Sequence, residues 1–308
     1  MSEPALLSPS QQRTLDALRR SGDPVVFDPA FVAALTGEVS DTLDHFAERL
    51  GDDADLWVSK HAIQTVLDCE ARFLAADDFE WSPANAAGTV AHKAIELLIW
   101  WRGEPVPADL VDEAIARLID EERGIGQWLG GLGSADEADL RGQGATRVTQ
   151  FMEHFPPLTA RFRPVTEARI RFPVDGPIIL GGKVDLAFGT NHENESRKVI
   201  VDLKTGRASP QHRQDLGFYA LVETLRCGVP PRKVATFYLD AAEAQVEDVT
   251  EAFLRSAARR TLDGIHNMVD LELEKRPATR QPGASCRWCP LSADCAEGSA
   301  HLAALAGP

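Results

Sequence analysis

Two short segments contain the residues whose types and spacing could do chemistry. In KVIVDLKTG, Asp202 and Lys204 stand two positions apart at the end of an apolar run, and in GGKVDLAFG, Asp185 follows two glycines. Alternate residues of a strand point to the same face, so Asp202 and Lys204 would lie together while Val201 and Leu203 face the core. If the two segments are paired strands, Asp185 joins them at one point.

Two carboxylates with water suit Mg²⁺ or Mn²⁺, which are hard cations that prefer oxygen ligands. Such an ion polarises a phosphodiester and lowers the pKa of a bound water. Lys204 would position that water or stabilise the developing charge. The simpler interpretation is an ion pair at the end of a surface strand, which the D-x-K spacing alone favours. The surroundings of the three residues must decide between these interpretations.

Strands and helices that could position these residues follow one another in a mixed order. Hydrophobic periodicity predicts helices over 8–21, 29–50, 59–76, 85–101, 107–122, 211–228 and 249–273. It predicts strands over 168–174, 178–188, 198–204 and 233–240, with a hairpin connection at 190–197. Ser8 or Ser10, Asp28 and Ser59 are the candidate N-caps. The expected fold class is α/β, with a helical N-terminal elaboration.

The segment between the helical half and the first of these strands has weaker signals. Residues 124–144 are rich in glycine and polar side chains, which predicts a loop. A helix is expected to follow this loop and to end near Phe162. The polar stretch 51–55 marks a plausible boundary, so we expect an N-terminal extension over 1–55 and a core over 56–280. Residues 281–308 would then form a C-terminal tail.

Composition and charge restrict the function without deciding it. Of 308 residues, 44% are hydrophobic and 26% are charged, which is typical of a soluble globular protein. No apolar run is long enough to cross a bilayer and the N-terminus lacks a secretion signal, so a cytoplasmic location is expected. The net charge of −15 argues mildly against a nucleic-acid partner, although a basic groove within an acidic protein stays open.

The order G-G-K-V-D, spacer, V-D-L-K-T-G and amphipathic helix resembles the PD-(D/E)XK nuclease superfamily. The most similar part of it is the RecB-like branch, which includes AddB-type and CRISPR-adaptation nucleases. The resemblance implies a restriction-endonuclease-like core whose metal is held around Asp185, Asp202 and Lys204. It also implies a further metal ligand, His92, because GTVAHKAIE has the branch's G-x-x-x-H spacing from Gly88. A solvated helical histidine is the alternative.

The helix after the lysine departs from the pattern of that branch. The branch has Q-x-x-x-Y, whose residues support the site and touch nucleic acid. Here Tyr219 is present, but Asp215 occupies the place of the glutamine, and Gln214 lies five positions before the tyrosine. Residues four apart share a helix face, so Asp215 and Tyr219 lie together and Gln214 is rotated away. The usual nucleic-acid contact is therefore in doubt. Glu167 matches an acidic position of the family or is a solvated strand residue.

Cysteines form a second group of candidate ligands. Cys286, Cys289 and Cys295 are spaced C-x₂-C-x₅-C in the tail, and three thiolates need a fourth ligand to hold a metal or a cluster. The resemblance implies a [4Fe–4S] cluster whose fourth ligand is Cys69, in CEARF, although Glu70 replaces the proline of the family's C-P-x-R-F. Zinc at the same ligands is the alternative. Cys227 matches nothing in this pattern and is interpreted as a buried structural thiol.

These observations predict a metal-dependent nuclease, with an exonuclease acting on DNA ends or single strands as the leading hypothesis. DNA is expected rather than RNA, in repair, recombination or defence. The sequence contains no G-x-x-x-x-G-K-[ST] phosphate loop, so a helicase partner would be a separate polypeptide. The rival hypothesis is a non-catalytic nucleic-acid-binding or scaffolding protein that has kept the fold. The complete set of Asp185, Asp202 and Lys204 argues against that rival.

Overall fold

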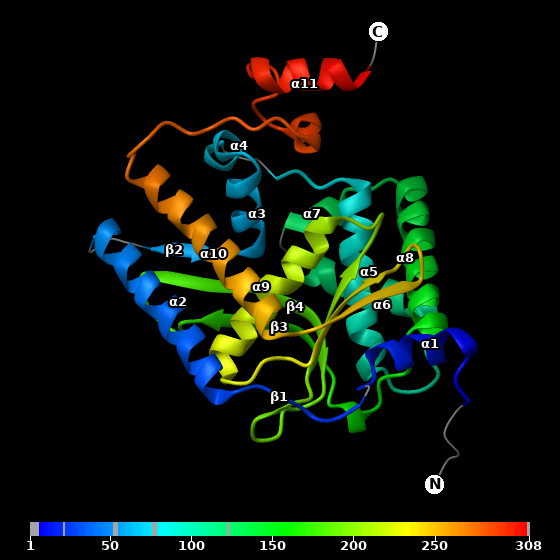
Figure 1. The fold of residues 1–308 in the computed structure, drawn as a ribbon. Helices are drawn as coiled ribbons and strands as arrows, with labels where there is room; N and C mark the ends of the chain where they lie inside the picture. Colours follow the sequence, from blue (N-terminus) through cyan, green and yellow to red (C-terminus); the bar gives the residue numbers. More distant parts are fainter. Residues whose placement is uncertain (1–5, 21, 52–54, 76–78, 122–123, 307–308) are drawn as a thin grey trace.

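The computed structural model describes residues 6–20, 22–51, 55–75, 79–121 and 124–306. Within these residues, six strands form one mixed sheet at the centre of the molecule (Figure 1). They are β2 (Leu56–Val58), β3 (Val165–Phe172), β4 (Ile178–Phe188), β6 (Val199–Lys204), β7 (Lys233–Tyr238) and β8 (Glu243–Asp248). Their order is β2-β4-β6-β7-β8, and β3 also pairs with β4. The predicted α/β fold class is confirmed.

The pairing of β4 with β6 positions the chemistry. The two strands are antiparallel, with Phe188 opposite Val199 and Leu186 opposite Val201, so the predicted hairpin is confirmed. The connection between them also contains β5 (Glu195–Ser196), which pairs with β1 (Val25–Val26). On the other side of β6, β7 runs parallel to it. Strands β2 and β8 were not predicted, because each is short or lacks an apolar run.

Helices cover both faces of the sheet. One face carries α2 (Pro29–Leu50), α3 (Lys60–Asp68), α9 (Pro210–Cys227) and α10 (Glu251–Glu272). The other carries α5 (Pro83–Trp100), α6 (Pro107–Asp120), α7 (Gly124–Gly130) and α8 (Ser134–His154). The remaining helices are α1 (Pro9–Leu18), α4 (Glu70–Leu74) and α11 (Ala296–Ala306), with short 3₁₀ turns at Ala160–Phe162 and Ala284–Trp288. Each face of the sheet therefore has its own hydrophobic core.

Alternation along β6 divides its residues between these two cores. Ile200 packs into the core with α2, α3, α9 and α10, whereas Val199, Val201 and Leu203 pack into the core with α5, α6 and α8. Asp202 shares the face of Ile200, so it points toward α3 and α9. The prediction that Val201 and Leu203 face the core is confirmed, because at most 3% of either residue is accessible to solvent.

Two of the predicted helices end or break differently in the structure. The helix predicted over 59–76 is interrupted at Cys69, whose extended backbone (φ −163°, ψ 110°) separates α3 from α4. The helix expected to end near Phe162 ends at His154, before the prolines of FPPL can disturb it. The predicted N-caps are confirmed at Ser8, Asp28 and Ser59, whose side chains accept backbone N–H groups in the first turn.

The prediction of a loop over 124–144 is wrong, because α7 and the first half of α8 occupy it. Its glycines serve close packing rather than flexibility. A Cβ on Gly126 would lie 2.6 Å from the Leu118 carbonyl oxygen, and one on Gly144 would lie 3.2 Å from a methyl group of Val111. Glycine thus lets α7 and α8 pack against α6, and tertiary packing outweighs the low helix propensity.

The N-terminal helix α2 packs into the same core as the strands. Its buried residues Phe31, Val32 and Leu35 belong to the hydrophobic cluster that includes α9 and α10. Residues 52–54, within the stretch predicted as a domain boundary, lie outside the described residues, and the division at residue 55 stays a prediction. In the described part of the chain, no helix is both long and apolar enough to span a membrane.

Candidate active site

The site begins where β4 and β6 stop pairing. Leu186 and Val201 form the last ladder pair, and one step further the Asp185 carboxylate takes the place of a strand carbonyl. Its Oδ2 accepts a hydrogen bond of 2.8 Å from the Leu203 backbone N–H. This bond fixes Asp185 beside Asp202 and Lys204, as the sequence predicted from strand pairing.

Asp202 lies between two lysines and is only 1% exposed. Its Oδ2 is 2.7 Å from Lys204 Nζ, and its Oδ1 is 3.1 Å from Nζ of Lys60, the first residue of α3. Lys60 also reaches Oδ2 of Asp215 at 3.2 Å, and Lys204 approaches the same oxygen at 3.5 Å. Two ammonium groups and two carboxylates therefore alternate in one cluster.

Lys60 was missed by sequence reasoning. It stands 142 positions before Asp202 and follows an N-cap serine, so neither its spacing nor its neighbours indicate a partner. Burial alone would lower the pKa of Lys60, but the carboxylates of Asp202, Asp215 and Asp185 outweigh burial and raise it. The ammonium group is therefore charged at neutral pH, and it neutralises part of the acidic cluster.

Beside this cluster, one imidazole and two carboxylates could hold a metal ion. One ligand atom each from His92, Glu167 and Asp185 lies within 4.8 Å of the others. His92 Nδ1 is 3.5 Å from Asp185 Oδ1. Three such donors fit a divalent cation with open positions for water and substrate. The structure thus brings His92 and Asp185 together, adds Glu167, and leaves Asp202 paired with lysines.

The G-x-x-x-H spacing has a structural reason. Gly88 lies one turn before His92 on α5, and a Cβ there would be 3.3 Å from the hydroxyl of Thr205, just after β6. The glycine therefore allows α5 to approach the end of β6 closely enough for His92 to reach Asp185. A larger residue at this position would push the imidazole away from the carboxylates.

Charges within the site shift its pKa values in opposite directions. Burial disfavours the charged imidazole, but Asp185 outweighs burial and raises the pKa of His92. Burial likewise disfavours the Asp185 carboxylate, yet His92 and the Leu203 N–H lower its pKa to about 2. For Glu167, burial is the stronger influence and raises the pKa although Lys183 forms an ion pair with it. The side chains of His92, Glu167 and Asp185 therefore form a site that favours a positive charge.

Helix α9 packs against the site through Tyr219. The Tyr219 hydroxyl donates a hydrogen bond of 2.7 Å to the Lys183 carbonyl oxygen, and Lys60 Nζ lies 4.7 Å from the centre of the tyrosine ring. A Cβ on Gly182 would be 3.0 Å from that ring, so the second glycine before Asp185 admits Tyr219. Asp215 faces the same cluster and also lines a neighbouring pocket between α9 and α10, which Gln214 lines as well.

Two of the tail cysteines, Cys286 and Cys295, lie near one another, but the four predicted cluster ligands do not form a close group in the described residues. A Cβ on Gly298 would be 3.3 Å from Cys295 Sγ and 3.4 Å from Cys286 Sγ, which places both sulfurs beside the start of α11. Cys69, at the break between α3 and α4, is 4.0 Å from the Thr279 carbonyl oxygen. Cys69, Cys286, Cys289 and Cys295 are half-buried free thiols.

The interpretation of Cys227 as a buried thiol is wrong. It is exposed at the C-terminal end of α9, where its sulfur lies 3.3 Å from Glu223 Oε1. The last turn of an amphipathic helix carries residues past the edge of the core, so an apolar side chain there is not covered.

The fold is a mixed sheet between two helical layers, and acidic residues and a lysine lie where two of its strands diverge. This combination defines a nuclease-type α/β fold. The model of the PD-(D/E)XK nuclease superfamily matches residues 58–296. The chain belongs to this superfamily. A search of the curated proteins finds no match.

Two solved structures show weak likeness. A crystal structure of a "Putative exonuclease" from Eubacterium rectale is 11% identical, covers 75% of this chain and 87% of its own, and has a TM-score of 0.45. The structure of Scheffersomyces stipitis Rai1 in complex with (3'-NADP)+ and calcium ion is 10% identical, covers 82% of this chain and 68% of its own, and has a TM-score of 0.24.

Proposed function

We propose that this chain is a Mg²⁺- or Mn²⁺-dependent nuclease that degrades DNA from its ends, in repair, recombination or defence in the cytoplasm. One observation carries the proposal: in a chain of the PD-(D/E)XK nuclease superfamily, His92, Glu167 and Asp185 converge beside the Asp202–Lys204 pair. The mixed nitrogen and oxygen donor set suits a divalent cation. The RecB-like branch remains the part of the superfamily that its motifs resemble.

Each residue of the site has a separate task in this proposal. His92, Glu167 and Asp185 hold the cation, and the Leu203 N–H keeps Asp185 in position. Asp202 supplies a further carboxylate ligand through its buried Oδ2, which lies 2.7 Å from Lys204 Nζ. When bound, the cation polarises the phosphodiester and acidifies the attacking water. Lys204 stabilises the negative charge that grows on the phosphate.

The direct test is cleavage of end-labelled single- and double-stranded DNA and of RNA by the purified protein. Cleavage should require Mg²⁺ or Mn²⁺ and stop when a chelator is added. Asp202→Asn should reduce the rate by at least about 10²-fold, the usual scale for removal of one catalytic electrostatic group. Metal-independent binding without any cleavage would instead support the rival hypothesis of a non-catalytic nucleic-acid-binding protein.

We further propose that Cys69, Cys286, Cys289 and Cys295 hold a [4Fe–4S] cluster. Its support is the position of Cys69 next to the segment that leads into the tail: the Ala71 N–H donates to the Thr279 carbonyl oxygen at 3.1 Å. A cluster there would join the tail to α3 and α4. Its role is structural, because it closes a long loop of the unfolded chain.

The cluster is tested by anaerobic purification, absorption spectroscopy and elemental analysis. We expect a coloured protein that contains iron and sulfide, and Cys289→Ser should lose both. Cys227→Ser is the matched control and should keep them, since Cys227 is exposed on α9. A colourless protein that contains zinc would assign the same four ligands to a zinc site instead.

A further inference from the structure

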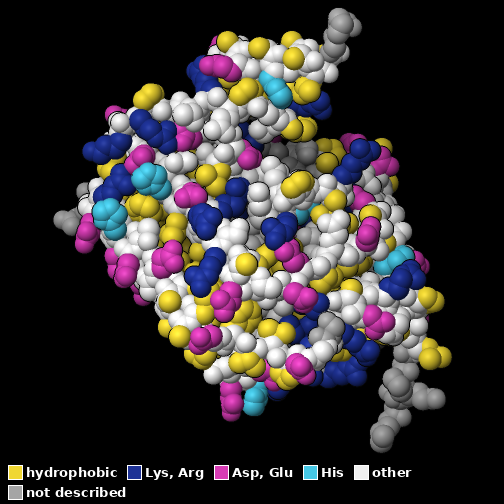
Figure 2. Space-filling model, in the orientation of Figure 1, with side chains coloured by type: hydrophobic (Ala, Val, Ile, Leu, Met, Phe, Trp, Pro, Cys, Tyr) yellow, Lys and Arg dark blue, Asp and Glu magenta, His cyan; other side chains and the backbone are white. Residues whose placement is uncertain are grey.

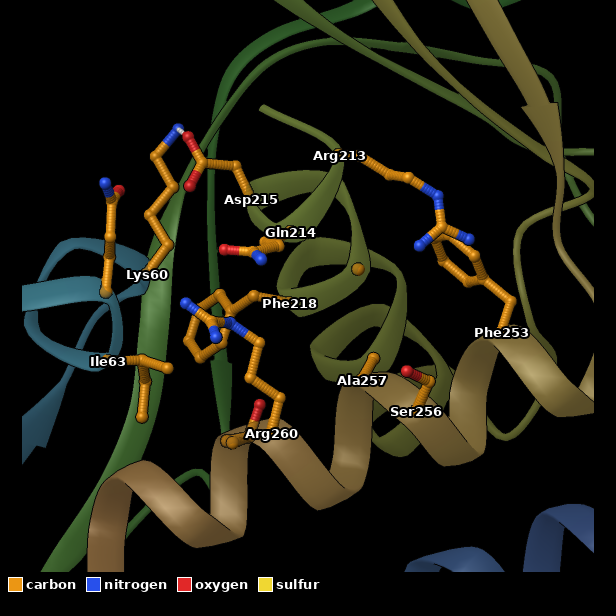
Figure 3. Close-up of a pocket in the computed structure, with 13 residues that line it drawn as sticks. Lys60, Ile63, Arg213, Gln214, Asp215, Phe218, Phe253, Ser256, Ala257 and Arg260 are labelled. Atoms are coloured by element: carbon orange, nitrogen blue, oxygen red, sulfur yellow. Dashed lines mark ion pairs between the residues drawn. The ribbon is translucent and has the colours of Figure 1, made fainter. Parts of the chain in front are cut away.

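A small pocket opens beside the active site, between α3, α9 and α10 (Figure 3). Lys60 lines it on one side and Asp202 is on the far side of the same ammonium group. The cavity measures about 50 Å³. One water needs roughly 10–15 Å³ on this scale, so the space suits a group of a few heavy atoms.

The pocket is lined by apolar side chains, several hydrogen-bond donors and one carboxylate, that of Asp215, which is paired with Lys60. Arg260 extends from α10 into the space between α3 and α9, toward Phe218 and Gln214 (Figure 3). Gln64 on α3 and Gln214 on α9 add two side-chain amides. Apolar walls come from Ile63 and Phe253. Hydrogen-bond donors around a small cavity with apolar walls suit a compact anion.

Of the cationic side chains that line the pocket, Arg260 is the one available to bind a ligand. Lys60 is paired with Asp202 and Asp215, and Arg213 is paired with Glu247. Arg260, in contrast, forms no hydrogen bond or ion pair with any described residue. Asp68 and Asp215 are the acidic groups whose charges act on it from α3 and α9. Its planar guanidinium is half-buried, which reduces the competition from water.

Several lysine and arginine side chains lie on the surface around the pocket (Figure 2). Figure 2 shows lysine and arginine side chains gathered in the middle of the face, over the region where α3, α9 and α10 meet in Figure 1. The whole chain carries a net charge of −15, so these basic side chains are a local group on an acidic protein. A local group of cations of this kind can direct a polyanion to one place on the surface.

We propose that the pocket between α3, α9 and α10 binds a backbone phosphate of the nucleic acid near the cleaved bond, with Arg260 as its main contact. The proposal rests on the proposed nuclease function. Lys60 and Asp215 border both the pocket and the acidic cluster, so the phosphate bound in the pocket is a neighbour of the cleaved one on the same strand. Arg260 is thus a positioning residue, and Gln214 reaches the substrate at this pocket instead of at the metal.

The test compares Arg260→Gln with Arg259→Gln, the adjacent exposed arginine on the same helix, which has no ion pair with a described residue. Binding of a fluorescent single-stranded oligonucleotide is followed by anisotropy in the presence of a chelator. Arg260→Gln should weaken binding about tenfold, as expected for loss of a charged hydrogen bond. The slope of log K against log salt should fall by about 0.7, the value for one phosphate contact on a single strand.

Cleavage of a dinucleotide, which is too short to reach both the active site and the pocket, separates positioning from structural damage. Arg260→Gln should cut the dinucleotide at the wild-type rate and should raise KM for the long substrate without lowering kcat. Arg260→Lys should restore part of the binding, because it keeps the charge but not the planar fork. Arg259→Gln should match the wild type in every measurement.

The outcomes of these experiments are distinct. Unchanged binding and salt slope in Arg260→Gln would overturn the proposed pocket, even if the wild type cleaves DNA. An equal loss of activity on the dinucleotide would overturn it too, since the defect would then lie at the active site. If the wild type binds but does not cleave, and Arg260→Gln weakens that binding, the pocket stands and the nuclease proposal fails.

Discussion

The Glu70 carboxylate accepts two hydrogen bonds of 2.6 Å from the guanidinium of Arg276. The same carboxylate accepts the backbone N–H and the hydroxyl of Thr279, each at 2.8 Å. Glu70 is 5% exposed and stands where the resembled nucleases have proline after the cysteine. This bidentate pair holds the segment after α10 against α4, and so places the start of the tail beside Cys69.

The Glu70–Arg276 pair should make stability depend on pH. Hydrogen bonds from Arg276, and then from Thr279, lower the pKa of Glu70 from 4.5 to about 2, although burial opposes them. A carboxyl with a lowered folded-state pKa stabilises the fold above its unfolded value. That stabilisation is lost as the pH falls from about 4.5 toward about 2. Urea unfolding measured across this range checks the prediction.

Glu70→Gln is the matching variant. It keeps the shape of the side chain but loses the charge, so it should cost about 1–3 kcal/mol at neutral pH and flatten the pH dependence over the same range. A variant with the full acid dependence of the wild type would show that other carboxyl groups are responsible.

Lys60→Met should destabilise the protein as well as change its site. In this variant, Lys204 is the remaining cation beside both Asp202 and Asp215. A buried carboxylate that loses its ion-pair partner lowers the free energy of unfolding. We expect about 2–3 kcal/mol, somewhat below the range for fully buried pairs, because 24% of the Lys60 side chain is exposed. Adding Asp215→Asn should recover part of the loss. Arg117→Gln, which breaks an exposed pair with Glu113, should cost under about 1 kcal/mol.

His92→Gln should weaken metal binding without unfolding the protein. Replacing a proposed ligand should reduce Mn²⁺ affinity by about 10²-fold, at the upper end of what supporting residues contribute. Isothermal titration with Mn²⁺ measures this directly, and it does not depend on cleavage. His45→Gln on the exposed face of α2 is the control. Equal affinities for His92→Gln and wild type would exclude His92 as a ligand.

Gly126→Ala tests why the segment predicted as a loop is helical. The new Cβ would lie 2.6 Å from the Leu118 carbonyl oxygen, so α7 must shift away from α6. Overpacking of this kind costs about 1–3 kcal/mol. Gly142→Ala on α8 meets no atom within 4 Å and should be neutral or slightly stabilising, since alanine favours helix. Thermal unfolding of both variants compares the two effects.

Local patterns predicted the parts of the fold whose residues are close in sequence. The strands around Asp185 and Asp202, helix α9 and its end at Gly228 follow from alternation, periodicity and a C-terminal glycine. Lys60 could not be found in this way, because its partners lie on β6 and α9 and only the fold brings them together. Glu167 was ambiguous for the same reason: its place beside His92 depends on how β3 pairs with β4.

The hydrogen bond from the Leu203 backbone N–H to Asp185 connects strand β6 to the proposed metal site. An ion bound at Asp185 Oδ1 would draw electron density from the carboxylate. The hydrogen bond that Oδ2 accepts from the Leu203 N–H would then weaken, and the environment of this amide proton would change. This single main-chain group is therefore a built-in spectroscopic reporter of occupancy. In isotopically labelled protein, its nuclear magnetic resonance frequency would follow a Mg²⁺ titration, with no substrate or reaction needed.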